Sequence, residues 1–232
     1  MKTTLFRIPN LTSRTAEPVK PWEKSLAIPS FSEKEEFRKW AQSDTTDGVF
    51  VSAFEGINPH ARVSKSNDPY KMHGLIADYD TPLTDEELLE GLARGSKPGF
   101  KPMFAHKTFS SGARVVWMFE EPVYVLPGVL KEFLGLLVKE TKAKNLFPRM
   151  DDAIFKPDQY YAWWPGAIRF ADAPVRTEAV HSILSEAVER SKKYRGEGDV
   201  AIPLERIFQK VQEMYPGRWT GPFEEGMRGP LF

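Results

Sequence analysis

The sequence predicts an α+β fold in which helices pack against an antiparallel β-sheet, and three observations lead to this prediction. From Met72 onward, β-prone stretches and amphipathic stretches follow one another in the order strand, helix, strand, strand, helix, strand. The second and third of these strands are joined by a wide, polar turn around Gly112 and look like a β-hairpin. Two of the helices expected along the chain begin with a Ser/Thr-x-x-Glu capping box.

The first 70 residues are expected to form an N-terminal αβ module. Residues 1–30 are rich in Pro and Thr and predict an irregular lead-in with one edge strand. A capping box formed by Ser32 and Glu35 predicts a helix after this lead-in. Residues 48–54 predict a strand, and the many turn-forming residues of 56–70 predict a long loop.

Residues 71–175 are expected to form the core of the fold. The first strand runs to Asp80, and the second capping box, Thr84 with Glu87, opens the helix that follows. The remaining expected elements are strands at 103–107, 114–119 and 167–170 and a helix that begins near Gly128. This order is the split βαβ arrangement of ferredoxin-like and RRM-like sheets, in which the first strand lies in the centre of the sheet.

The last part of the chain, residues 176–232, is expected to be a helical appendage or a connection to a further domain. Apolar residues recur at helical spacing in 178–194 and in 204–215, and a polar, glycine-containing linker lies between them. The apolar ending of the sequence leaves open whether the chain is a fragment of a longer polypeptide.

Composition narrows the functional classes. The 232 residues include 32 Lys and Arg and 32 Asp and Glu residues, so nucleic-acid binding would need a local basic patch, not an overall excess of positive charge. The absence of cysteine excludes disulfides, thiolate metal sites and a cysteine nucleophile, and it fits a reducing compartment. No apolar run reaches membrane-spanning length and no signal-peptide core is present, so we expect a cytoplasmic protein with no membrane partner.

A pair of acids ends the first strand of the expected core. Side chains alternate along a strand, so Asp78 and Asp80 should point to one face while Tyr79 points to the other. Two adjacent carboxylates repel each other unless a cation lies between them or one of them holds a proton. Oxygen ligands of this kind suit Mg²⁺ or Mn²⁺. The alternative is a strand-end turn with two solvated acids.

The turn between the two hairpin strands is the second candidate site. It offers two cations, three hydroxyl groups and a glycine whose neighbouring N–H groups could hold a phosphate. The residues expected to bind phosphate are Lys107, Ser110, Ser111, Gly112 and Arg114. The alternative is an ordinary hairpin loop.

A second acid pair, Asp151 and Asp152, precedes a β-prone segment and is the third candidate cluster. Read alone, it could be a solvated turn. Together with Asp78, Asp80 and the basic turn, it would complete a two-metal site beside a triphosphate pocket. That combination suits nucleotidyl transfer, in which metal ions activate a 3′-hydroxyl and neutralise the departing pyrophosphate.

These motifs, in this order, resemble those of the archaeo-eukaryotic primase superfamily, specifically phage-type primase-polymerases. The family shows an apolar strand ending in D-x-D, here residues 75–80. A small-residue turn followed by His or Arg on a strand comes next, here residues 110–114. An apolar residue followed by Asp, with Pro-Gly beyond, completes the set, here Met150-Asp151 and Pro165-Gly166. The resemblance covers about residues 45–175.

The resemblance implies a primase-polymerase palm in residues 1–175. In that reading, Asp78, Asp80 and Asp151 are the catalytic acids and hold two Mg²⁺ or Mn²⁺ ions, with Asp152 the alternative third ligand. The expected substrates are deoxynucleoside or nucleoside triphosphates, and the expected partners are single-stranded DNA template, primer and a fused or associated helicase. The implied setting is phage or plasmid DNA replication, in the host cytoplasm if the protein is phage-encoded.

The chain departs from the family pattern in two places. Arg114 stands where His is more common, so a guanidinium would bind phosphate instead of an imidazole. The basic residue usual before Pro165-Gly166 is replaced by an aromatic run, and Arg169 would supply the missing charge.

Two other functions remain open at this stage. Residues 78–84 also resemble the D-x-D-x-T opening of haloacid-dehalogenase-type phosphatases, with Asp78 as the nucleophile and Asp80 as the acid-base group. Against this, the strands after Asp80 form a hairpin, whereas that parallel-sheet fold needs single strands alternating with helices. The second alternative is a non-catalytic module that binds single-stranded nucleic acid on exposed aromatic residues.

The aromatic run and the histidines are expected to be mainly structural. The run consists of Tyr160, Tyr161, Trp163 and Trp164, of which one or two exposed members could stack on a base. The four histidines show no metal-ligand spacing, and His106, although near the proposed pocket, is expected to be structural.

Overall fold

The computed structural model describes residues 5–8, 39, 42–43, 48–58 and 63–194. Contacts divide the chain into two units, Met1–Ser191 and Lys192–Phe232, and nearly all described residues belong to the first. The helix expected after Ser32 lies outside the described residues except for Lys39, and the helix expected at 204–215 lies outside them completely.

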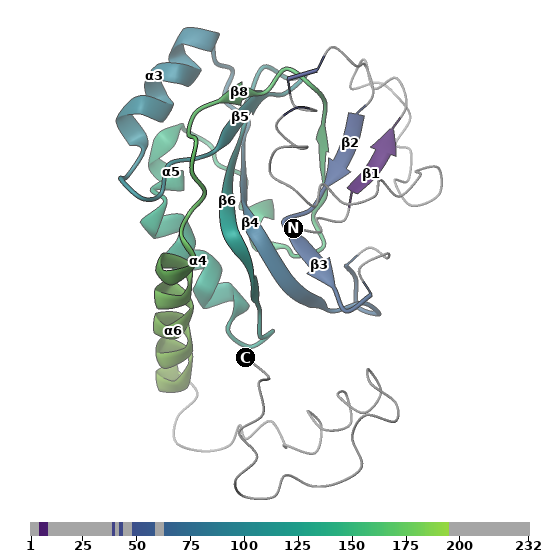
Figure 1. The fold of residues 1–232 in the computed structure, drawn as a ribbon, viewed down its shortest axis with the longest axis vertical. Helices are drawn as coiled ribbons and strands as arrows, with labels where there is room; N and C mark the ends of the chain where they lie inside the picture. Colours follow the sequence, from purple (N-terminus) through teal and green to yellow (C-terminus); the bar gives the residue numbers. More distant parts are fainter. Residues whose placement is uncertain (1–4, 9–38, 40–41, 44–47, 59–62, 195–232) are drawn as a thin grey trace, which may run out of the picture. The chain divides into compact units, whose positions relative to one another are not determined.

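A five-stranded antiparallel sheet forms the centre of the first unit (Figure 1). Its strands, in spatial order, are β3 (Phe54–Gly56), β4 (Pro69–Tyr79), β6 (Ala113–Tyr124), β5 (Phe104–Lys107) and β8 (Ile168–Arg169). The two long strands, β4 and β6, pair in the middle. With the helices described below, this sheet confirms the predicted α+β class.

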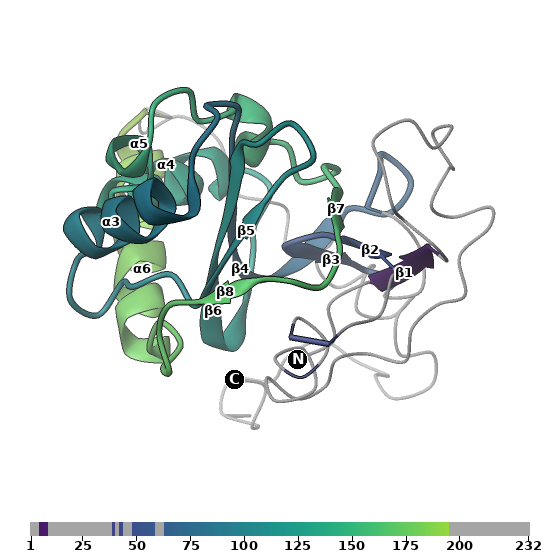
Figure 2. The ribbon, with the colours of Figure 1, turned by 90° about the horizontal axis from the view of Figure 1, so that it is seen from above.

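Helices cover one face of this sheet, and a second, three-stranded sheet lies on the other (Figure 2). The helices are α3 (Asp85–Gly95), α4 (Leu130–Glu140), α5 (Ala143–Leu146) and α6 (Thr177–Tyr194). The small sheet has the order β1 (Leu5–Ile8), β2 (Gly48–Val51) and β7 (Tyr161–Trp163). No helix among the described residues is long and apolar enough to cross a membrane.

Side-chain alternation along β4 separates two apolar cores. Leu75, Ala77 and Tyr79 pack in the core on the helix side, whereas Ile76 packs in the core that faces the small sheet. Asp78 therefore follows Ile76 onto the small-sheet face. This is the separation of Asp78 from Tyr79 that the sequence predicts.

Helix α3 begins as its sequence predicts. The Thr84 hydroxyl accepts a hydrogen bond from the Glu87 amide, and the Glu87 carboxylate accepts one from the Thr84 amide. These two bonds satisfy amides that have no partner within the helix, which fixes the start of α3 shortly after the end of β4.

Helix α6, which the sequence assigns to a C-terminal appendage starting at residue 176, belongs to the main core. Its Val180, Ile183 and Ala187 are buried in the core on the helix side. The boundary between the two units lies after Ser191 instead.

The observed sheet differs from the predicted ferredoxin-like arrangement mainly in the position of the fourth strand. The central order β4, β6, β5 is the expected one, but β8 pairs with the outer edge of β5 instead of flanking β4. Beside β4 lie β3 and, at its C-terminal end, Met150, which forms an isolated antiparallel bridge with Tyr79. The strand expected at 48–54 is likewise two strands, β2 and β3, in different sheets, because the chain crosses between the sheets at Ser52 and Ala53.

Candidate functional site

The C-terminal end of β4 carries a salt bridge between two adjacent strands. Asp78 and Arg114 are register partners on β4 and β6. Arg114 donates from Nε to Asp78 Oδ1 at 3.2 Å and from Nη2 to Asp78 Oδ2 at 3.0 Å. The side chains are only 10% (Arg114) and 19% (Asp78) exposed. This two-point contact fixes the plane of the carboxylate.

Arg114 is held from two further directions. Its Nη1 donates to the carbonyl oxygen of Ala162, and its guanidinium carbon lies 5.2 Å from the ring centroid of Tyr161. Both Tyr161 and Ala162 belong to β7, so this strand of the small sheet contacts Arg114 directly. All three donor nitrogens of Arg114 are therefore engaged in this structure.

Residues 149–151 bring a second carboxylate to this end of β4. The Asp151 amide donates to the Asp78 carbonyl at 2.8 Å, and the Asp80 amide donates to the Arg149 carbonyl at 3.3 Å. The Asp151 carboxylate accepts a hydrogen bond from the Ala153 amide at 2.9 Å, which caps the short helix η1 (Asp152–Phe155). Asp151, Arg114 and Asp78 are hereafter called the strand-end site.

The sequence left open whether Asp151 or Asp152 would be the third metal ligand. Of these two acids, Asp151 is the one whose amide bonds to the backbone of Asp78. Asp152 lies in the first turn of η1 and is exposed. Asp80 follows β4 and is also exposed. The structure thus brings Asp78, Asp80 and Asp151 to one strand end through backbone pairing.

The β5–β6 turn sits directly against this strand end. The Ser111 carbonyl accepts a hydrogen bond from the Leu83 amide at 2.9 Å. A Cβ atom at Gly112 would lie 2.1 Å from the Tyr79 carbonyl oxygen, so only glycine permits this approach. Ser111 adopts a left-handed conformation with φ of 63°. The turn expected to bind phosphate is therefore adjacent to the expected catalytic acids.

Two expected phosphate-binding cations have protein partners. Lys107 pairs with Asp85 at the start of α3 at 3.2 Å. Arg169 bonds to the exposed Asp172 and lies on the edge strand β8, in register with Phe104. Arg169 shares the sheet face of Phe104, but two strands, β5 and β6, separate it from Asp78.

His106 and Tyr161 flank Arg114, although neither was expected from the sequence to belong to the site. His106 is the register partner of Arg114 on β5 and is only 1% exposed. Burial and the charge of Arg114 lower the pKa of His106 to about 3, against a hydrogen bond with the Trp164 backbone that raises it. The imidazole is therefore neutral at neutral pH. The register between strands determines that His106 lies beside Arg114, and local sequence patterns do not encode that register.

The hydroxyl of Tyr161 points into a buried, charged environment. Burial raises its pKa most, the charges of Asp78 and Asp151 raise it further, and Arg114 lowers it. Both acids of the strand-end site thus act on one side chain. The Tyr161 oxygen is buried and has no hydrogen-bond partner in the structure.

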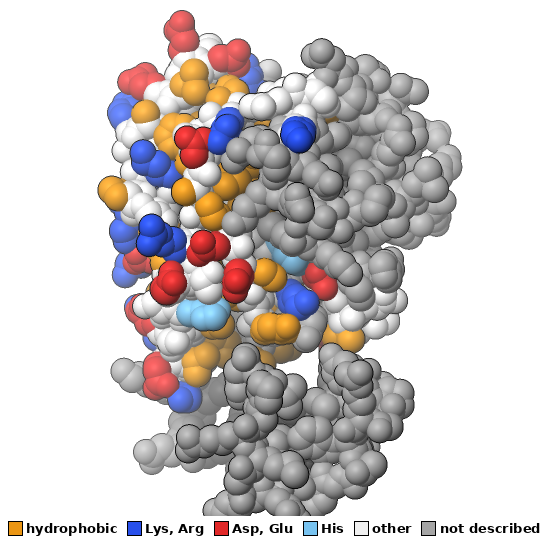
Figure 3. Space-filling model, in the orientation of Figure 1, with side chains coloured by type: hydrophobic (Ala, Val, Ile, Leu, Met, Phe, Trp, Pro, Cys, Tyr) orange, Lys and Arg blue, Asp and Glu red, His pale blue; other side chains and the backbone are white. Residues whose placement is uncertain are grey.

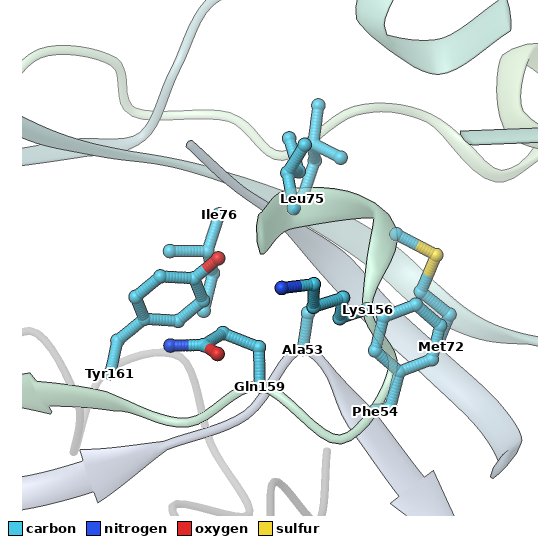
Figure 4. Close-up of a pocket in the computed structure, with 9 residues that line it drawn as sticks. Ala53, Phe54, Met72, Leu75, Ile76, Lys156, Gln159 and Tyr161 are labelled. Atoms are coloured by element: carbon cyan, nitrogen blue, oxygen red, sulfur yellow. The ribbon is translucent and has the colours of Figure 1, made fainter. Parts of the chain in front are cut away.

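A small cavity lies beside Tyr161, and Figure 4 shows Tyr161, Gln159 and Lys156 around it. Its volume of about 10 Å³ is room for roughly one water molecule. Its other lining residues are all apolar and include Phe54, Met72 and Leu75. This cavity is too small for a nucleotide.

The donor chemistry of this strand end suits a hard divalent cation, because carboxylate oxygens are the ligands that Mg²⁺ and Mn²⁺ prefer. In the described part of the chain, however, no three Asp, Glu or His side chains are grouped closely enough to hold a metal ion. The Asp78 carboxylate is turned toward Arg114. An ion bound here would compete with the Arg114 guanidinium for the Asp78 carboxylate.

The face of the molecule seen in Figure 3 shows acidic and basic side chains interspersed. This distribution agrees with the formal net charge of zero. No protein-family model matches the chain, and no curated protein or solved structure is significantly similar to it.

Proposed function

We propose that the protein is a nucleotidyltransferase that adds nucleotides to a 3′-hydroxyl on a DNA template, as a primase-polymerase does. The observation that supports this proposal is the pairing of residues 149–151 with the end of β4. This pairing places Asp151, far along the sequence, beside Asp78 and Asp80. The turn with Lys107 and two serines lies against the same strand end.

In the proposed reaction, the 3′-hydroxyl of the primer loses its proton to solvent water, and its oxygen forms a bond with the α-phosphorus of a nucleoside triphosphate. The bond between the α-phosphorus and its bridging oxygen breaks, and pyrophosphate leaves with the negative charge. Asp78, Asp80 and Asp151 would hold two Mg²⁺ or Mn²⁺ ions, which lower the pKa of the 3′-hydroxyl and neutralise charge on the pyrophosphate. The acids' own task is to hold these ligand positions on a rigid strand end.

Arg114 has two competing partners in this proposal. In the structure it orients the Asp78 carboxylate and neutralises its charge. A triphosphate offers Arg114 an alternative anion, and its release from Asp78 frees both carboxylate oxygens. The hydroxyl groups of Ser110 and Ser111 and the Lys107 ammonium lie on the same turn and would contact the same phosphates, with Arg169 farther along the sheet.

The alternative functions receive less support. A phosphatase with Asp78 as nucleophile needs a parallel sheet with single crossover strands, and the five-stranded sheet here is antiparallel. A purely strand-binding module gives no reason for two carboxylates to be drawn together at the site, because carboxylates repel phosphates unless cations intervene.

Primer extension tests the proposal. The protein is incubated with a primed single-stranded template, nucleoside triphosphates and Mg²⁺ or Mn²⁺, and product length is read on a gel. Asp80→Asn and Asp151→Asn leave the Asp78–Arg114 pair intact and should each lower the rate at least 100-fold, because each removes a ligand charge. Glu86→Gln is the matched control, because Glu86 is an exposed residue of α3, and it should act as wild type does.

Full activity in both Asp80→Asn and Asp151→Asn, with far-UV circular dichroism unchanged, would exclude this mechanism. Release of phosphate from a small phosphoester, with no primer extension, would support the phosphatase instead. If primer extension is observed, the expected partners are template, primer and a fused or associated helicase.

A further inference from the structure

The tip of the β5–β6 turn carries a surface aromatic pair whose members are far apart in sequence. Phe109 and Trp164 stack with ring centroids 3.7 Å apart and planes 11° apart. Phe109 is 38% exposed, although it belongs to the turn that carries the proposed phosphate-binding residues. Phe109 and Trp164 are hereafter called the aromatic platform.

Buried rings hold the aromatic platform in place. Trp164 meets His106 edge-on, with centroids 4.2 Å apart, and His106 stacks on Trp163 at 4.7 Å. His106 and Trp163 are each only 1% exposed. The outer rings are therefore fixed by inner rings that the sheet positions, so a ligand would meet a surface that is already ordered.

Phe109 stays partly exposed despite its contact with Trp164. Five large hydrophobic side chains are exposed among the described residues, and Phe109 is the one that lies on the turn beside the strand-end site. The hydroxyl groups of its sequence neighbours Thr108 and Ser110 lie 3.0 Å apart and hydrogen-bond to each other, so they form a single polar cluster on the same turn. A partly exposed aromatic ring at such a turn offers a flat surface on which a nucleic-acid base can stack.

We propose that the aromatic platform binds a base of single-stranded nucleic acid, and that this strand is the template of the proposed polymerase reaction. The inference rests on the proposed function only for the role of the strand. A strand fits better than a free nucleotide, because the platform lies at a turn tip and a strand gains affinity from successive contacts along a surface. Every base has a flat π-face, so binding should show little sequence preference.

Fluorescence polarisation of labelled oligonucleotides tests the aromatic platform, in EDTA and without nucleotides so that the metal site is not involved. The probes are oligo(dT) and an oligonucleotide of equal length and charge that lacks bases. Wild-type protein should bind oligo(dT) about 10-fold more tightly, as expected for one stacked base. Phe109→Leu keeps the apolar contact with Trp164 but removes the ring and should abolish this preference, whereas Phe109→Trp should retain it.

Tyr124→Leu is the matched control, because Tyr124 is 59% exposed at the far end of β6 from the turn. It should leave the preference for oligo(dT) unchanged. Equal wild-type affinity for the two oligonucleotides, or a preference that persists in a folded Phe109→Leu variant, would overturn the proposal.

The two proposals fail separately. Base-dependent strand binding by a protein that extends no primer would keep the aromatic platform and remove the polymerase function. Primer extension by a protein whose Phe109→Leu variant still prefers oligo(dT) would keep the function and remove the platform.

Discussion

The two faces of the large sheet are built from the same strands but have different chemistry. Alternate residues of β4 and β6 form an apolar core on the helix side, and their neighbours face the small sheet. The residues on the helix side include Leu75, Ala77, Val115 and Trp117. On the small-sheet side, Ile76 and Val116 are followed toward the strand end by Asp78 and Arg114, with His106 beside them on β5.

This difference bears on why polar residues lie at the strand end on the small-sheet side. Replacing a buried ion pair with apolar residues of similar size is often neutral or stabilising, so the Asp78–Arg114 pair is weak evidence for stability. The helix side shows that the chain can fill the same strands with apolar residues. Retention of the pair at the strand end is better explained by a task at the surface than by folding.

The largest expected effect comes from breaking the pair on one side only. Asp78→Asn leaves the Arg114 charge largely buried and should lower the free energy of unfolding by about 3 kcal/mol. Asp78→Leu combined with Arg114→Met replaces the ion pair with apolar side chains like those on the helix side. The free energy of unfolding of this double variant should stay within about 1 kcal/mol of the wild-type value. Urea denaturation measures both values.

Asp80→Asn is the control, because Asp80 is exposed and should change stability by less than about 0.5 kcal/mol. A loss in Asp78→Asn no larger than that in Asp80→Asn would mean that the pair is solvated and that the two faces differ less than described.

The next effect is a pH dependence carried by His106. Its folded pKa of about 3 lies below the ordinary histidine value of 6.5, so the unfolded chain binds more protons between these two pH values. The free energy of unfolding should therefore fall as the pH is lowered through this window, by about 2 kcal/mol between pH 7 and pH 5. His106→Phe keeps a ring between the two tryptophans and should lack this loss.

Urea midpoints at pH 7 and pH 5 for the wild type and His106→Phe give the difference directly. His181→Gln on the exposed side of α6 should behave as wild type does at both pH values. An equal loss in wild type and His106→Phe would assign the acid sensitivity to other groups.

The smallest effect compares one tyrosine from each face. The Tyr79 hydroxyl on the helix side donates to the Ala143 carbonyl, whereas the Tyr161 hydroxyl on the polar side has no partner. Tyr79→Phe should therefore destabilise by about 1 kcal/mol, because the buried Ala143 carbonyl loses its donor. Tyr161→Phe should be neutral or slightly stabilising, since it removes an unsatisfied polar atom.

Thermal unfolding of the two variants checks this order. A loss on Tyr161→Phe as large as that on Tyr79→Phe would indicate an ordered water on the Tyr161 hydroxyl, in the adjoining cavity.

Local signals in the sequence predicted the elements well. The capping box at Thr84 and Glu87, the alternation of Asp78 with Tyr79 and the β5–β6 hairpin all depend on residues close together in the chain, and the structure has each of them. The position of the last strand was predicted wrongly, because pairing with β4 or with β5 is a choice that local patterns do not encode.

The site was predictable only as a set of residue types. The order of the motifs grouped Asp78, Arg114 and Asp151 in one site. Arg114 was expected to bind phosphate, whereas in the structure it pairs with Asp78. Strand register decides that pairing. The contact between Phe109 and Trp164 is of the same kind, since it joins a turn to the end of a strand in another sheet.

The guanidinium of Arg114 also acts as a built-in counter-ion for the carboxylate beside it. Many clustered acids in proteins repel one another until an external cation arrives, so the apo chain is loosened or partly unfolded. Here the positive charge is covalently part of the neighbouring strand. Assembly of the sheet is thereby uncoupled from the supply of divalent ions in the surroundings, and the chain should fold cooperatively in the presence of a chelator.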